Sequence, residues 1–140
     1  MRVKAFSCSV HGFSELGNSV LNAVTIGQAK VRYWRRVVDA WDGVPFTAIR
    51  ARVVGEPFTD DAMRRIAEYR LVPFARAGMR VVHGANDEGV LVGSNSSANF
   101  DVLFTSGRFK GQVLNCHPRY GIAYFADDGA VLADFRTVVG

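Results

Sequence analysis

Hydrophobic and polar positions alternate along two short stretches in the first half of the chain. Residues 2–10 and residues 46–54 both interleave apolar side chains with polar or charged ones. A period of two is typical of a half-buried β-strand, so we predict a strand over each stretch, with Arg50 and Arg52 on the solvent side of the second. Residues 11–24 mix glycine and asparagine with scattered apolar side chains, and we expect a loop there with one short element at most.

A helix is predicted between these strands, because Thr25 and Gln28 have the spacing of a capping box. In this arrangement the threonine hydroxyl accepts a hydrogen bond from the Gln28 backbone N–H, and the Gln28 side chain reaches back to the start of the helix. The expected apolar face comprises Ile26, Tyr33, Trp34, Val37 and Trp41, and the opposite face comprises Arg32, Arg35, Arg36 and Asp39. Strand, helix and strand together predict a β-α-β-like unit with the helix packed on a small sheet.

A second, shorter helix is predicted to begin at Thr59-Asp60-Asp61, which offers an N-cap oxygen and acidic residues in the first turn. One side of this helix carries Met63, Ile66, Ala67 and Tyr69, and the other carries Arg64, Arg65 and Glu68. We expect Pro73 to close the segment.

From residue 78 onward the apolar runs become short and are separated by Gly, Asn, Asp and Ser. Six strands are predicted, over residues 79–83, 89–94, 100–105, 113–115, 121–125 and 131–135. The last two are joined by a hairpin turn in which Gly129 can supply a positive φ. Short, closely spaced strands indicate a small closed barrel. The predicted fold is α+β: a basic β-α-β unit with a short helix (1–76), then an SH3-like antiparallel β-barrel (77–140).

The phrases that begin the C-terminal half resemble SH3-like barrels of the KOW and Tudor type. They are Ala77-Gly78-Met79-Arg80-Val81-Val82, Gly89-Val90-Leu91-Val92-Gly93 and Phe100-Asp101-Val102-Leu103-Phe104. Because such barrels recur in proteins that touch RNA, ribosomes or polymerases, the resemblance implies a nucleic-acid context by analogy.

The whole chain is also similar to small uncharacterised open reading frames of phage and prophage genomes. The phrases concerned are Gly27-Gln28-Ala29-Lys30, Arg32-Tyr33-Trp34, Phe46-Thr47-Ala48-Ile49-Arg50 and the stretch 95–104. That family has no established activity, so the resemblance implies a context and a fold but no mechanism.

Positive charge is concentrated toward the N-terminus of this 140-residue chain. Residues 1–77 hold 12 Lys or Arg against 7 Asp or Glu, whereas residues 78–140 hold 5 against 6. Arginine supplies most of the cations, and its planar fork of donors suits phosphates and carboxylates. The candidate phosphate-binding surface comprises Arg32, Arg35, Arg36, Arg50, Arg52, Arg64 and Arg65. In the alternative interpretation these arginines only solubilise separate elements and pair with Asp39, Glu56 and Glu68.

A second candidate site is the polar loop over residues 93–99. Its proposed contact residues are Asn95, Ser96, Ser97 and Asn99 with Phe100 beside them, and Phe109 and Tyr120 are further flanking aromatics. The alternative is a turn in which the Asn and Ser side chains cap their own backbone.

No metal or cofactor is predicted. Cys8 and His11 have a permissible ligand spacing, but adjacent Cys116 and His117 would point to opposite faces of a strand. Cys116 with a nearby histidine or Asp101 could be imagined as a nucleophile and base, yet the chain has no nucleophile elbow, phosphate loop or dinucleotide fingerprint. We therefore expect a protein that is not an enzyme.

The expected compartment is the cytoplasm. No apolar run approaches the roughly 18 residues that span a membrane, the N-terminus turns polar at Ser7, and two cysteines do not make a disulfide framework. The first functional hypothesis is a nucleic-acid-associated accessory protein that contacts DNA or RNA phosphates through its arginines. The alternative is a phage-encoded, protein-binding inhibitor of a host enzyme or defence complex that grips an acidic surface.

Overall fold

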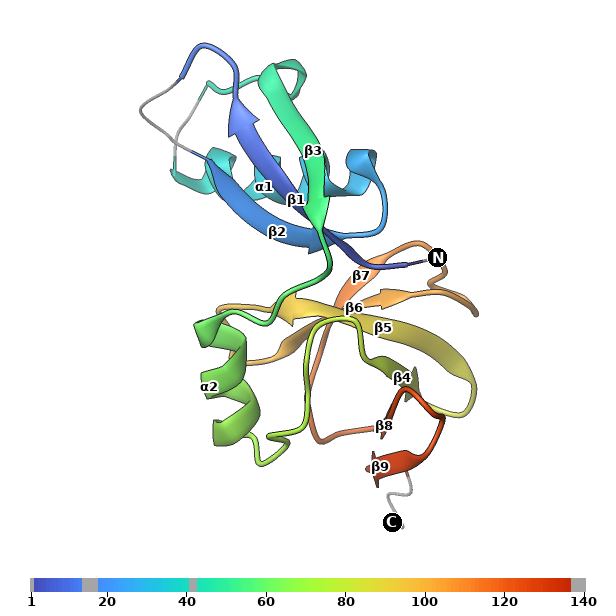
Figure 1. The fold of residues 1–140 in the computed structure, drawn as a ribbon. Helices are drawn as coiled ribbons and strands as arrows, with labels where there is room; N and C mark the ends of the chain where they lie inside the picture. Colours follow the sequence, from blue (N-terminus) through green and yellow to red (C-terminus); the bar gives the residue numbers. More distant parts are fainter. Residues whose placement is uncertain (1, 14–17, 41–42, 137–140) are drawn as a thin grey trace. The chain divides into compact units, whose positions relative to one another are not determined.

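The computed structural model describes residues 2–13, 18–40 and 43–136, which contain two α-helices and nine β-strands in two antiparallel sheets. The predicted α+β fold class is confirmed. The chain divides into two compact units, Met1–Phe58 (unit 1) and Thr59–Gly140 (unit 2), each with a sheet of its own (Figure 1). This division falls earlier in the chain than the predicted boundary after residue 76.

Unit 1 is built on a three-stranded antiparallel sheet in the order β2-β1-β3. Its strands are β1 (Lys4–Val10), β2 (Ser19–Ala23) and β3 (Ile49–Gly55), and a short 3-10 helix, η2 (Phe46–Ala48), precedes β3. β1 and β3 were predicted, whereas β2 lies in the stretch expected to be mainly loop. β1 and β3 pair directly and antiparallel, so the unit is β-β-α-β and differs from a parallel β-α-β crossover.

Helix α1 (Ile26–Ala40) covers one face of this sheet (Figure 1). Its start confirms the predicted capping box. The Thr25 hydroxyl accepts the Gln28 N–H at 3.1 Å, and the Gln28 side chain accepts the N–H of Val24 at 2.9 Å. Two N–H groups that lack partners within the helix are thereby satisfied.

The buried face of α1 is narrower than predicted. Ala29, Tyr33 and Val37 recur every four residues and pack into the core with the sheet. Ile26 was expected on this face but is 48% exposed, because it precedes the turn at which the helix meets the sheet. Trp34 is half-buried against the same core. Trp41 lies outside the described residues.

Helix α2 (Asp61–Tyr69) begins as predicted, with the Asp60 carboxylate accepting the N–H of Met63 at 2.8 Å. Met63 and Ala67 are buried in the core of unit 2, so the helix belongs to that unit. Tyr69 was predicted on the same side but is 73% exposed, because it lies two residues after Ala67 and so points away from the buried face of the helix. No helix in the described ranges is long and apolar enough to cross a membrane.

Unit 2 contains a six-stranded antiparallel sheet in the order β7-β6-β5-β4-β8-β9. Its strands are β4 (Arg80–His83), β5 (Asp87–Ser94), β6 (Phe100–Phe104), β7 (Val113–Cys116), β8 (Ile122–Phe125) and β9 (Val131–Asp134). All six overlap the predicted strands. β8 returns to pair with β4, as the predicted barrel requires, and β9 pairs on the far side of β8. The predicted hairpin turn is confirmed by Gly129, which has φ 89°.

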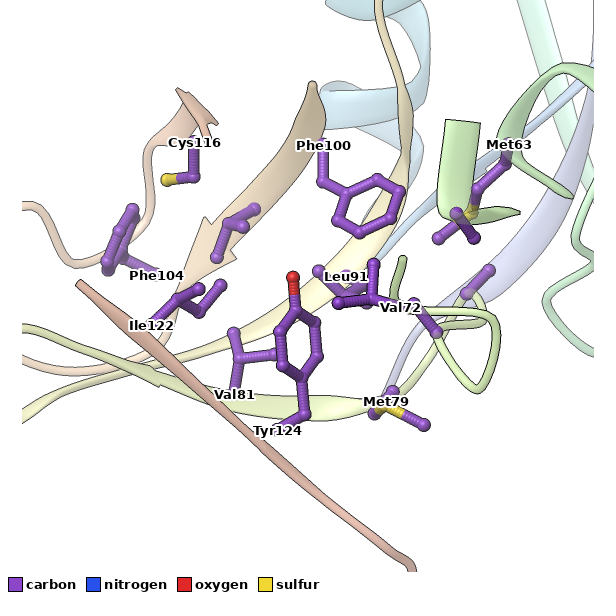
Figure 2. Close-up of a cluster of buried hydrophobic side chains, with 14 residues drawn as sticks. Met63, Val72, Met79, Val81, Leu91, Phe100, Phe104, Cys116, Ile122 and Tyr124 are labelled. Carbon is purple, nitrogen blue, oxygen red and sulfur yellow. The ribbon is translucent and has the colours of Figure 1, made fainter. Parts of the chain in front are cut away.

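The core of unit 2 is formed by inward side chains of the sheet, covered at one side by α2 and the segment after it (Figure 2). Val81, Leu91 and Ile122 are completely buried, and Val72 packs against them from outside the sheet. Tyr124 is also buried, and its hydroxyl donates to the Pro118 carbonyl at 2.5 Å. This bond removes the cost of burying an unpaired hydroxyl.

Gly89 lies where β5 and β6 pack closely, with no room for a side chain. A Cβ at this position would lie 2.7 Å from Val102 Cγ1 and 2.8 Å from the Leu103 carbonyl oxygen. Because a backbone oxygen in a paired strand cannot move aside, we expect Gly89→Ala to destabilise unit 2 by about 1–3 kcal/mol, measured as a lower urea midpoint.

Gly27→Ala in α1 is the matched control for this substitution. Its new Cβ would meet nothing nearer than the Thr25 hydroxyl, at 4.0 Å. It should leave the stability of the chain unchanged or raise it by up to about 1 kcal/mol. Equal urea midpoints for Gly89→Ala and the unsubstituted chain would contradict the packing described.

Candidate functional site

The sheet face opposite α1 carries two of the predicted arginines. One end of this face is buried at Ala5 and Asn22, where Asn22 bonds the backbone of Phe58, and we call the remainder the uncovered sheet face. In the register of β1 and β3, Ser9 pairs with Arg50 and Ser7 pairs with Arg52. Successive side chains of a strand point to opposite faces, and the alternate residue Cys8 is buried toward α1. The two serines and the two arginines therefore lie together on the uncovered face, and both arginines are exposed.

The arginines of α1 lie elsewhere in unit 1. Arg35 is exposed midway between the buried Tyr33 and Val37, which places it on the outer side of the helix, away from the sheet. Arg36 is exposed on the flank of the helix, and Arg32 is half-buried and donates to a carbonyl of β2. Arg35 and the β3 arginines are thus on opposite sides of the sheet, because the sheet and the helix each turn their apolar side inward.

Arg64 and Arg65 belong to α2 of unit 2. Arg64 Nη1 lies 2.6 Å from the Asp61 carboxylate, and Arg65 is exposed. Glu56, an expected partner of the predicted arginine set, forms its ion pair with Arg2. The seven predicted arginines are therefore distributed over α1, β3 and α2, and only those of β3 share the uncovered sheet face.

The two units differ in net charge. Unit 1 holds eight Lys or Arg against four Asp or Glu, whereas unit 2 holds nine of each. The whole formal charge of +4 therefore resides in unit 1. At neutral pH unit 1 is therefore net positive, whereas the formal charges of unit 2 balance.

The Ser/Asn loop of unit 2 is a preformed turn organised by Asn95. Its side-chain oxygen accepts the N–H groups of Ser97 at 3.1 Å and Asn99 at 3.4 Å, and its amide nitrogen donates to Asp101 at 3.0 Å. The backbone adds a bond from Asn95 N–H to the Asn99 carbonyl at 3.0 Å. Asn95 thus caps its own loop, as the alternative interpretation predicted, while Ser96 and Ser97 stay exposed at its tip.

The aromatic residues predicted beside this loop differ in accessibility. Phe100 is completely buried in the core of unit 2 (Figure 2), so its prediction as a contact residue is corrected. It follows the loop directly as the first residue of β6, where its side chain points inward. Phe109 is half-buried against Phe104, with ring centroids 6.0 Å apart. Tyr120 is 66% exposed.

Arg70 joins three segments of unit 2 and was not predicted as a functional residue. Its Nε donates to the Ala98 carbonyl at 2.9 Å, and its Nη2 donates to the Asn99 side-chain oxygen at 3.2 Å. Its Nη1 lies 3.3 Å from His117 Nε2. The guanidinium carbon is also 5.4 Å from the centroid of the Tyr69 ring. We call Tyr69, Arg70, Leu71, Ser96, Ser97 and His117 the Arg70 surface.

Two residues next to the bonds of Arg70 have strained backbone conformations. In the described part of the chain, Leu71 (φ 60°) and Ala98 (φ 57°) are the non-glycine residues with positive φ. Leu71 follows α2 where helices usually carry glycine, with Val72 N–H bonded to the Ala67 carbonyl at 2.8 Å. A leucine there costs about 1 kcal/mol or more relative to glycine, and its side chain is 68% exposed. The turn is fixed in spite of this cost by the bonds from Leu71 N–H to the Glu68 carbonyl and from Val72 N–H to the Ala67 carbonyl.

His117 faces a hydrogen-bond donor at each ring nitrogen. Nδ1 accepts the backbone N–H of Arg119 at 3.0 Å, while Nε2 faces Arg70. A neutral imidazole has one accepting nitrogen, so Nε2 carries the proton and two donors meet there. Burial, followed by the charges of Arg70 and Arg119, lowers the pKa of His117. This shift favours the neutral form of the ring.

The cysteines and histidines considered as metal ligands are divided between the units, with Cys8 and His11 in unit 1 and Cys116 and His117 in unit 2. Both cysteines are buried and free. Burial, followed by the charge of Asp101, raises the pKa of Cys116 to about 11. Among the residues that the structure describes, no group of three or more His, Cys, Asp or Glu is placed to hold a metal ion.

Comparison with known proteins found no matching family model, no matching curated protein and no matching solved structure.

The pKa of His117 reports the Arg70 contact directly. Since Arg70 helps to lower this pKa, Arg70→Ala should raise it toward the ordinary value of about 6.5, measured by NMR titration of the ring. A folded pKa below the unfolded one means that the unfolded chain binds the proton first. Stability is therefore lost as the pH falls below about 6.5, and less of it is lost in the variant. An unchanged pKa in Arg70→Ala would contradict the contact.

Cys116 should be a poor nucleophile in the folded chain. A rise of its pKa from 9.0 to about 11 leaves about 100-fold less thiolate at pH 8 than in the unfolded chain. We expect alkylation by iodoacetamide, followed at the Cys116 peptide by mass spectrometry, to slow by at least this factor on folding. Labelling at similar rates in folded and urea-unfolded protein would show that the thiol is accessible and ionised.

Proposed function

We propose that this chain is a nucleic-acid-associated binding protein, without catalytic activity, that contacts phosphates through the uncovered sheet face of unit 1. The observation that carries the proposal is the coincidence of charge and geometry. The unit that holds the entire net charge also leaves one sheet face uncovered, and Arg50 and Arg52 stand there side by side with two serines.

The chemistry of this face suits a phosphate backbone. Arg50 Nη1 donates to the Thr47 carbonyl at 2.8 Å, which holds the guanidinium beside the strand, and Arg52 is exposed two residues on. Ser7 and Ser9 add hydroxyl donors opposite these arginines. None of the paired β1, β2 and β3 positions on this face is acidic, so no carboxylate among them repels an incoming phosphate.

The same face favours backbone contact over base stacking. The paired positions of the three strands on this side carry small, aliphatic, amide or arginine side chains and no aromatic ring. Single-strand binding usually relies on aromatic platforms, whereas phosphate contact by arginine is independent of sequence. The proposed ligand is therefore the phosphate backbone of DNA or RNA, with an affinity that depends on salt more than on base composition.

The setting proposed for this function is the cytoplasm, in keeping with two buried, free thiols. The similarity to phage reading frames would make this the cytoplasm of a host cell. A role as a protein-binding inhibitor is the alternative, and a different surface, in unit 2, bears on protein binding.

Fluorescence anisotropy with labelled single- and double-stranded DNA and RNA tests the proposal. We expect affinity to fall steeply between about 50 and 200 mM salt. The double substitution Arg50→Ser with Arg52→Ser should weaken binding at least tenfold and reduce the salt slope by about 2, since each lost phosphate contact contributes about 0.9.

Arg35→Ser with Arg36→Ser is the matched control, because it removes two positive charges from α1 and none from the uncovered sheet face. Binding lost equally in this variant and the β3 double variant would show that net charge, and not this face, attracts the ligand. No binding to any of the four nucleic acids at low salt would reject the proposed function.

A further inference from the structure

We propose that the Arg70 surface of unit 2 binds a peptide segment of a partner protein that presents a carboxylate next to an apolar side chain. The residues of this site belong to unit 2 and differ from those of the uncovered sheet face of unit 1. The peptide-binding proposal can therefore be tested independently of the nucleic-acid proposal.

The carboxylate would occupy the point where two donors meet. Arg70 Nη1 and His117 Nε2 lie 3.3 Å apart, and the bond from Arg119 N–H to Nδ1 leaves the imidazole proton on Nε2. Two donors facing each other repel, and an acceptor placed beside both would relieve that repulsion. A carboxylate oxygen can accept from a guanidinium and an imidazole together, with the additional attraction of opposite charges. In the part of the chain that the structure describes, no carboxylate bonds either of these two atoms.

The apolar side chain would contact Leu71 and Tyr69. They are 68% and 73% exposed and flank Arg70 in the sequence, and the Tyr69 ring lies beside the guanidinium that would hold the carboxylate. Leu71 keeps an aliphatic side chain on a left-handed backbone that glycine would adopt without strain. An exposed leucine at such a position is explained by contact with another molecule.

The surface is held ready for binding. Arg70 anchors the Asn95–Asn99 loop to the end of α2 through Ala98 and Asn99, and Asn95 caps the loop from within. Little further ordering is then needed when a partner binds, which lowers the entropic cost of association. Exposed Tyr and Ser side chains on a rigid frame are the combination that protein-binding loops favour.

A protein partner fits this surface better than a nucleic acid. Unit 2 holds equal numbers of cationic and anionic residues, so it exerts no net attraction on a polyanion. Arg70 already donates through Nε and Nη2 within the chain, which leaves Nη1 as the nitrogen that faces only another donor. One acceptor position bordered by Leu71 and Tyr69 matches an Asp, a Glu or a chain terminus followed or preceded by an apolar residue.

The test is a selection of random peptides of about twelve residues, displayed on particles, against the intact chain, followed by affinity measurement on a synthetic peptide from the enriched set. We expect the enriched peptides to share an acidic residue beside an apolar one. Replacing that acid by its amide should weaken binding at least tenfold.

Substitutions in the chain then locate the site. Leu71→Gly and Tyr69→Ala should each lower the affinity for the selected peptide at least tenfold. The thermal midpoint of Leu71→Gly should not fall, because glycine relieves the backbone at this position. Leu132→Ala is the matched control, since Leu132 is 42% exposed on β9, and it should change the affinity less than twofold.

Several results would overturn the proposal. They are a selection that enriches no sequence, equal binding of the acid and amide peptides, and full affinity in Leu71→Gly. Loss of oligonucleotide binding in Tyr69→Ala would instead assign the surface to nucleic acid. A dimer seen by sedimentation and lost in Tyr69→Ala would assign it to a second copy of the chain.

Discussion

A half-buried guanidinium connects the parts of unit 2 that lie outside its sheet. The core in Figure 2 fixes α2 against the sheet, and Arg70 then fixes the Asn95–Asn99 loop to the end of that helix. Two unfavourable backbone conformations, at Leu71 and Ala98, persist beside these bonds. Strain of this kind is retained only where the surrounding contacts determine the conformation. At Ala98 the contact is the bond from Arg70, and at Leu71 it is the bond from Val72 N–H to the Ala67 carbonyl.

Elements specified by neighbouring residues were predictable from the sequence. The capping box at Thr25 and Gln28, the N-cap at Asp60 and the turn at Gly129 all involve groups a few positions apart. The six strands of unit 2 were also found, because each short apolar run is bounded by turn-forming residues. The α+β class followed from these local signals.

Features that depend on distant contacts were not predictable in this way. Whether residues 19–23 form a strand depends on β1, which lies beside them only after folding. The pattern of α2 suggested a buried Tyr69, but only Met63 and Ala67 are buried in the core, and Tyr69 points away from them. Arg70 shows no local signal for its role, since the carbonyl of Ala98 is 28 positions away. Likewise, arginines that seemed to form one set are separated by the sheet between Arg35 and Arg50.

The left-handed residues of unit 2 have a consequence for how this chain can change over time. The shape of the turns at Leu71 and Ala98 is set by torsion angles that asparagine, aspartate or glycine adopt with less strain. Descendants could therefore exchange the side chains at these two positions without repacking the interior. The backbone shape of the surface would then be retained while its side chains changed. Binding specificity could therefore change faster in evolution than the fold that supports it.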